Sequence, residues 1–182
     1  LCIVIFLMGT TNVVSMLQVL SYSRQYDAII TNITTANSIS SSLKPDIDNE
    51  MWKIVSGKIK FSEGRQYEIL DNVNSKVRGM MDNTDSKRAQ VKLDLVLRTL
   101  QSLREYVDLM GDKISNNSTA AENEAVLEDI RFATSVMEEV VQNYVLYEVN
   151  RTDGQYQAMR EGYVRWQIFS IILIFSAVGF SV

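Results

Sequence analysis

The residues with the most obvious potential for catalysis are carboxylates in the second half of the chain. Six of them fall between residues 122 and 139: Glu122, Glu124, Glu128, Asp129, Glu138 and Glu139. Two carboxylates can act as general acid and general base. The chain has no histidine, the commonest general base and metal ligand, and its one cysteine is Cys2. Because charges along a helix usually mark a solvated face, we predict no catalytic residue, no metal site and no cofactor.

A second set of candidate residues surrounds two glycines between residues 51 and 67. Three aromatic side chains and several basic ones lie here. A guanidinium can hold an anion through a forked pair of hydrogen bonds, and aromatic rings can stack on a ligand. The alternative is that these rings close the end of a helical bundle, since most aromatic clusters are packing. The candidate ligand-binding residues are Trp52, Phe61, Arg65 and Tyr67.

The distribution of charge divides the chain into three parts. All 18 basic and 22 acidic residues lie between Arg24 and Arg165. A bilayer core of about 30 Å needs roughly 20 apolar residues in a helix. The charge-free ends therefore predict transmembrane helices at residues 1–21 and 166–182, the second truncated, with Trp166 as an interfacial anchor. The alternatives are a signal peptide at the start and a buried core helix at the end.

The middle of the chain, residues 22–165, is predicted to be one helical domain. It holds the single proline, and breakers are scarce throughout the chain. Four stretches repeat apolar residues every three or four positions, and Leu93 to Ile114 is the clearest heptad. Because proline disfavours helix at the residue before it, Pro45 is expected to end the first stretch. The four stretches are 22–43, 46–80, 93–114 and 126–147.

The predicted fold is all-α, an antiparallel four-helix bundle continuous with two transmembrane helices. Short loops favour an antiparallel arrangement of neighbouring helices. Four such helices return the chain to the membrane face that it left. A turn is expected at Asn83–Ser86. In the loop that follows Ser115, Ser118 or Thr119 is expected to cap the last helix ahead of Glu122.

The segments WKIVSGKIKFSEGRQYEILDNVNSKV and NEAVLEDIRFATSVMEEVVQNYVLYEVNRT, set between two predicted spans, carry a resemblance to a known family. They resemble the extracytoplasmic input regions of bacterial sensor histidine kinases, most closely the YesM-like class. The resemblance covers most of the chain. It implies a multi-pass protein of the bacterial plasma membrane whose residues 22–165 sense a ligand or a protein outside. It also implies a homodimer, and a cytoplasmic kinase domain after Val182, so that this region is not itself an enzyme.

Other functions stay open on the sequence alone. One alternative is the sensory domain of a methyl-accepting chemoreceptor, and another is a membrane-tethered helical module that docks a partner without signalling. A membrane-bound enzyme with a carboxylate site is a third. The net charge of −4 argues against a nucleic-acid partner, which requires a basic face.

The segment from Val149 to Trp166, which leads from the last stretch into the second span, is the expected output rod. It contains no proline, and its soft points are two glycines. A nearly continuous helix can carry an axial shift of about 1–2 Å or a rotation. The candidate signal-transmission residues are Tyr147, Gly154, Gly162, Arg165 and Trp166.

Overall fold

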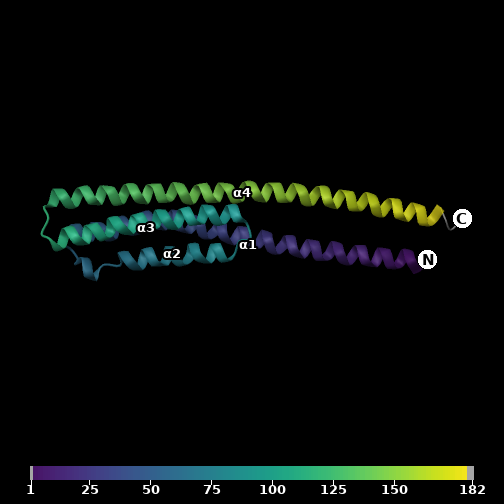
Figure 1. The fold of residues 1–182 in the computed structure, drawn as a ribbon, viewed down its shortest axis with the longest axis horizontal. Helices are drawn as coiled ribbons and strands as arrows, with labels where there is room; N and C mark the ends of the chain where they lie inside the picture. The colour runs from purple at the N-terminus through teal and green to yellow at the C-terminus, as the bar shows by residue number, and fades with distance from the viewer. Residues whose placement is uncertain (1, 180–182) are drawn as a thin grey trace. The chain divides into compact units, whose positions relative to one another are not determined.

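The computed structural model describes the backbone of residues 2–179. It describes their side chains except at positions 2–8, 11, 12, 15, 18, 155, 158, 159, 163, 166, 170 and 173–179. Every regular element in residues 2–179 is a helix (Figure 1). The elements are α1 (Cys2–Val55), the 3-10 helix η1 (Phe61–Glu63), α2 (Gln66–Asp82), α3 (Lys87–Ser115) and α4 (Ala120–Gly179). The all-α class predicted from the sequence is therefore confirmed.

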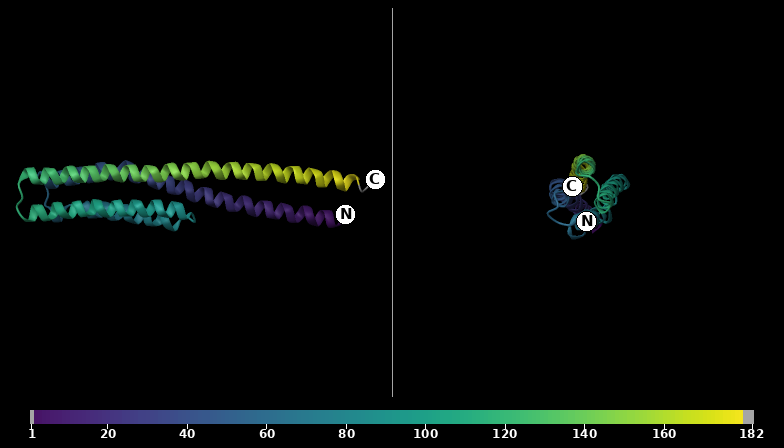
Figure 2. Two further views of the ribbon diagram at one scale, coloured as in Figure 1. Left: turned by 45° about the horizontal axis from the view of Figure 1, so that its top comes forward. Right: turned by 90° about the vertical axis from the view of Figure 1, so that its left-hand side faces the viewer.

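The chain separates into two compact units. One is Ile30–Glu148, and the other combines Leu1–Ile29 with Val149–Val182. Within Ile30–Glu148, successive helices run in opposite directions, and α2 and α3 lie side by side as a hairpin (Figures 1 and 2). All four α-helices contribute buried residues to one hydrophobic core in this unit. We call this unit the bundle.

The core of the bundle follows the heptads of the sequence. On α3 the six apolar residues at heptad spacing from Leu93 to Met110 are buried, and Ile114 is half-buried against the same core. On α4 the buried series runs from Val126 to Tyr144. Burial of a large apolar side chain contributes about 1.5–3 kcal/mol, so these stripes dominate the stability of the bundle. The six buried apolar residues of α3 at heptad spacing are Leu93, Val96, Leu100, Leu103, Val107 and Met110.

The expectation that Pro45 ends the first helix is wrong. Helix α1 continues through Pro45 to Val55. A proline inside a helix costs about 3 kcal/mol because it removes one backbone hydrogen bond. Leu43, Ile47 and Met51 lie on either side of it and are all buried on one face. Interrupting the helix would turn this face out of the core, so packing outweighs the local preference.

The break instead falls at the glycines between α1 and α2. Gly57 follows the end of α1 and has a φ of 73°, a left-handed conformation that glycine adopts readily. The predicted stretch 46–80 is therefore two elements, because its first part belongs to α1 and its second part to α2. Residues 2–179 still contain four α-helices, because the boundary expected at Pro45 lies instead between Val55 and Gln66.

The expected turn and helix cap are confirmed. Residues 83–86 connect α2 to α3, and the Ser86 hydroxyl accepts a hydrogen bond from the Ala89 N–H at 3.3 Å. Ahead of α4, the Thr119 hydroxyl accepts from the Glu122 N–H at 3.3 Å. The Glu122 carboxylate accepts from the Thr119 N–H at 2.8 Å, which completes a reciprocal capping box.

The second unit consists of the first part of α1 and the last part of α4, both helical in backbone. The side chains of the predicted spans, 1–21 and 166–182, lie in large part outside the described residues. Among the described residues, the structure contains no helix with the length and apolar character needed to cross a bilayer.

Candidate functional site

Phe61 of η1 and Tyr67 at the start of α2, two of the predicted ligand-binding residues, contact each other. Their ring centroids are 6.1 Å apart with an interplanar angle of 87°, an edge-to-face pair. Both rings are half-buried against the core. A Cβ atom at Gly111 of α3 would lie 2.6 Å from Cε1 of Phe61, so this ring lies close against the α3 backbone. The two rings therefore close one end of the bundle.

Tyr67 is fixed by polar contacts with α3. Its hydroxyl donates a hydrogen bond of 2.5 Å to Oδ1 of Asp108. The guanidinium carbon of Arg104 lies 5.2 Å from the centre of the Tyr67 ring. Burial, followed by the hydrogen bond to Asp108, raises the pKa of Tyr67 to about 12. The phenol is therefore neutral at physiological pH and acts as a hydrogen-bond donor to α3.

Arg65, the predicted anion-binding residue, already holds a carboxylate of its own chain. Its guanidinium makes a forked pair of hydrogen bonds to Glu68, at 2.8 and 3.0 Å. This hydrogen bonding raises the pKa of Arg65 and lowers that of Glu68. Both side chains are exposed, so the pair contributes little to stability. An external anion at Arg65 would have to compete with Glu68.

Trp52 lies apart from the other three candidates. It is on α1 with 46% of its surface exposed, and the ammonium of Lys58 lies 4.0 Å from its ring centre. Among the described side chains, no hydrogen bond or ring contact joins Trp52 to Phe61, Arg65 or Tyr67. The structure thus brings two of the four candidates, Phe61 and Tyr67, together and leaves the side chains of Arg65 and Trp52 exposed.

Glu50 holds the loop between α1 and α2 in place, and the sequence analysis did not predict this role. It is buried near the end of α1, with 6% of its surface exposed. One carboxylate oxygen accepts from the Arg65 N–H at 2.9 Å, and the other accepts from Nζ of Lys53 at 3.1 Å. The hydrogen bond from Arg65 is the main reason that the pKa of Glu50 is lowered. An available signal was its position three residues after Ile47, on the apolar face of α1.

The candidate signal-transmission residues are distributed along α4. Tyr147 is half-buried, and its hydroxyl lies 2.9 Å from the Ser86 hydroxyl at the start of α3. At Gly154 and Gly162 an added Cβ atom would meet, among the described atoms beyond the adjacent helix backbone, none within 4 Å. Arg165 is exposed and lies 3.6 Å from Glu161. The last candidate, Trp166, has a side chain outside the described residues.

The turn between α2 and α3 contacts both of the other helices of the bundle. Asn32 of α1 is buried, and its side-chain amide donates to the Met80 carbonyl at 3.0 Å. The Asn83 amide donates to Oδ1 of Asn32 at 3.3 Å. Together with the contact between Ser86 and Tyr147, these hydrogen bonds join the turn to α1 and to α4.

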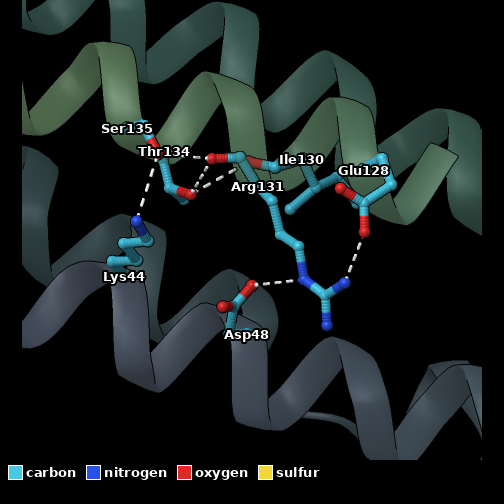
Figure 3. A network of polar contacts seen from close by, with 7 residues as sticks. All are labelled: Lys44, Asp48, Glu128, Ile130, Arg131, Thr134 and Ser135. Atoms are coloured by element: carbon cyan, nitrogen blue, oxygen red, sulfur yellow. Dashed lines mark hydrogen bonds and ion pairs between the residues drawn. The ribbon is translucent and has the colours of Figure 1, made fainter.

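A series of polar contacts joins α1 to α4 along the bundle. The sequence analysis did not predict these contacts either. Figure 3 shows Lys44 and Asp48 of α1 facing α4. Nζ of Lys44 donates to the Ser135 hydroxyl at 3.2 Å, and Arg131 lies 3.4 Å from Asp48. Further along, Gln142 of α4 donates to the Ser40 hydroxyl at 2.9 Å.

The order of these contacts defines the register of the two helices. As residue numbers rise from 40 to 48 in α1, those of the partners fall from 142 to 131 in α4. This is the order expected of an antiparallel pair. A shift of α4 along α1 would change all three contacts together.

Comparison of the chain with protein-family models, with curated proteins and with solved structures found no match to any of them. Among the described residues, no three or more acidic or cysteine side chains are grouped so as to hold a metal ion.

Proposed function

We propose that this chain is the extracytoplasmic sensory module of a bacterial membrane sensor histidine kinase. In this proposal, residues 22–165 form an antiparallel four-helix bundle that is continuous with two transmembrane helices at 1–21 and 166–182. A cytoplasmic kinase domain of the full-length protein receives the signal, and the active form is a homodimer. The resemblance of two long segments to such input regions supports the assignment.

The observation that carries the proposal is the make-up of α1 and α4. These helices have 54 and 60 residues, several times the average length in globular proteins. Each combines a charge-free apolar segment with a segment that contributes to the bundle core. A helix of this composition offers a direct mechanical route from a sensory bundle to a membrane.

The polar contacts between α1 and α4 indicate how a signal would pass. Each contact either joins side chains that are partly exposed or includes a hydroxyl group. Each therefore contributes no more than about 1 kcal/mol. Binding energy of a few kcal/mol is therefore sufficient to exchange these contacts for others. A change of about 1–2 Å in the axial position of α4 is a known switching movement of helices.

The membrane topology is tested by labelling a single cysteine. Asn116 is exposed in the loop between α3 and α4. With Cys2 replaced by serine, Asn116→Cys should react with a membrane-impermeant maleimide in intact bacterial spheroplasts. Reaction only after the membrane is permeabilised would contradict an extracytoplasmic bundle. Autophosphorylation from ATP in membranes that carry the full-length protein then separates a kinase from a chemoreceptor.

Transmission along α4 is tested by insertions after Gly162. One inserted residue turns everything beyond it by about 100°, whereas seven leave a drift of about 20°. Kinase output of the full-length protein should be disturbed by one residue and largely recovered by seven. Equal behaviour of the two insertions would show that rotational phase is not transmitted through this segment.

The homodimer is tested by crosslinking along α1. Single cysteines from Val13 to Tyr26, with Cys2 replaced, should form disulfides in membranes with a helical period. Tyr22 and Tyr26 are exposed at this end of α1, which is consistent with a contact to a second copy. Uniform failure to crosslink would exclude this helix as the dimer contact.

A further inference from the structure

A groove of about 380 Å³ lies on the surface of the hairpin formed by α2 and α3. Its volume is at the lower end of the range of small-molecule sites, which is about 300–1,000 Å³. Apolar side chains from both helices line it, and Leu70 and Leu100 among them belong to the bundle core. Met81 and Leu97 are half-buried beside them. The groove therefore offers apolar contacts that a small organic molecule can cover.

Three arginines also line this groove, although the whole chain is acidic. Arg104 makes an ion pair of 2.7 Å with Asp71, and Arg98 makes one of 2.8 Å with Asp94. Arg78 differs from both, because its Nε donates to the neutral amide oxygen of Asn74 at 3.0 Å. Among the described residues, no carboxylate forms an ion pair with Arg78. Its terminal Nη groups are therefore available to a negative ligand.

We propose that this groove binds a small organic acid, a molecule with one carboxylate and a compact apolar body. The carboxylate is held by the Nη groups of Arg78 through a forked pair of charge-assisted hydrogen bonds. The apolar body lies against Met81 and Leu97. Gln101, on the α3 side of the groove, supplies an amide that can donate to the same carboxylate.

This groove is a stronger candidate for an anion than the loop between α1 and α2. The guanidinium of Arg65 is already forked onto Glu68, whereas Arg78 has only a neutral partner. The binding itself does not depend on signalling. The further step, that this acid is the ligand which the sensory module detects, rests on the proposed function. A binding measurement and a kinase measurement therefore test the two ideas separately.

The test is equilibrium dialysis of the purified full chain in detergent against radiolabelled phenylacetate, with benzoate and hexanoate as competitors and empty micelles as the blank. The neutral analogue phenylacetamide should compete at least about tenfold more weakly, because it cannot form the charge-assisted pair. Arg78→Gln should weaken binding of phenylacetate by about tenfold or more. Arg88→Gln, an exposed arginine of the same hairpin outside the groove, should bind like the parent chain.

A second pair of variants covers the case in which Arg78→Gln disturbs the fold. Gln101→Glu brings a negative charge into the groove and should weaken binding to a similar extent. Ser102→Glu adds the same charge at an exposed position next to it and should have little effect. Melting followed by circular dichroism checks that all variants are folded.

Three results would overturn the proposal. One is the absence of saturable binding of all three acids to the full chain. Another is binding to Arg78→Gln and Gln101→Glu that equals binding to the parent. The third is a combination of two observations: the acids do not bind, and the chain self-associates in a way that Arg78→Gln abolishes. This result would make the groove a contact between copies. Saturable binding with no effect on autophosphorylation would instead refute the sensory role and leave the binding site intact.

Discussion

The two ends of the bundle are closed by different chemistry. At the end that holds the loop between α1 and α2, a buried carboxylate and two half-buried rings fix the chain: Glu50 accepts from Arg65, and Phe61 lies against Gly111. At the other end, the hydrogen bonds from Asn32 to Met80 and between Ser86 and Tyr147 join neutral groups, although the carboxylate of Glu148 is buried next to Tyr147. We call these the loop end and the turn end.

The difference indicates which end is able to rearrange. Contacts of the loop end combine a buried charge with close packing, and losing either partner leaves a buried group unsatisfied or a void. At the turn end, the hydrogen bond between the Ser86 and Tyr147 hydroxyls is only part-buried, so it contributes about 0.5–1.5 kcal/mol and can be exchanged for one to water. The loop end is therefore the fixed end of the bundle, and at the turn end the contact between Ser86 and Tyr147 is the one that a modest binding energy can alter.

The largest effect is expected for Glu50→Ala at the loop end. This change leaves the Arg65 N–H without its acceptor and should lower the free energy of unfolding by about 2–3 kcal/mol. The control is Glu63→Ala, where an exposed glutamate is removed from the same loop. Chemical denaturation followed by circular dichroism measures both. Equal stability of the two variants would contradict a fixed loop end.

The same carboxylate gives the loop end a dependence on acid pH. Its pKa in the folded state lies below the ordinary value of 4.5. The stabilisation is therefore fully present above pH 4.5 and is lost as the pH falls through the lowered pKa. Glu50→Gln should remove this part of the acid sensitivity while keeping the side-chain oxygen as acceptor.

The next largest effect is expected for Gly111→Ala. An added Cβ would lie 2.6 Å from the Phe61 ring, so the ring has to move, at a cost of about 1–2 kcal/mol. Gly79→Ala on α2 is the matched control, because a Cβ there meets no atom within 4 Å. It should be neutral or stabilising by up to about 1 kcal/mol, from the better helix propensity of alanine. Destabilisation by both substitutions to the same degree would show that packing at Phe61 is unimportant.

A smaller effect is expected at the turn end for Tyr147→Phe. Removal of the hydroxyl opposite Ser86 should cost about 1 kcal/mol or less. Tyr106→Phe, at an exposed position of α3, serves as the control and should cost nothing measurable. Under the proposed sensory function, Tyr147→Phe should change the kinase output of the full-length protein more than Gly111→Ala does. The reverse order would show that the loop end is the one that rearranges.

The smallest effect is expected in alkali, where Tyr67 titrates. Its pKa is raised from 10.0 to about 12 in the folded protein. The stabilisation is therefore present below pH 10 and is lost as the pH rises toward 12. Because the ring is only half-buried, solvent screening keeps the change below about 1 kcal/mol. Tyr67→Phe should remove this loss, and an unchanged pH profile in that variant would assign it to another group.

Much of the fold was predictable because it depends on local periodicity. The heptads gave the core face of α3, and the spacing of Thr119 and Glu122 gave the cap of α4. The position of the break between α1 and α2 was not predictable from Pro45, because the outcome depends on how Leu43 and Ile47 pack on the other helices. A local preference of about 3 kcal/mol is outweighed by several buried side chains.

The contacts of the candidate site were less accessible to sequence reasoning. Tyr67 and Asp108 are 41 positions apart, and their pairing depends on the register of α2 against α3. No periodicity encodes that register. The pairing of Arg65 with Glu68, by contrast, spans three residues at the start of a helix and is visible as a local motif. Only the aromatic closure by Phe61 and Tyr67 was foreseen, as the alternative to a ligand site.

The proline inside α1 has a kinetic consequence. The ring of Pro45 removes the amide that would otherwise bond to the carbonyl four residues earlier, so the ladder of hydrogen bonds in α1 is interrupted once. An opening that starts at the C-terminal end of α1 can stop there. Residues 46–55 thus form a separate segment for local unfolding, and their amide protons should exchange with deuterium as a group. Its exchange rate would report directly on how often the loop end opens.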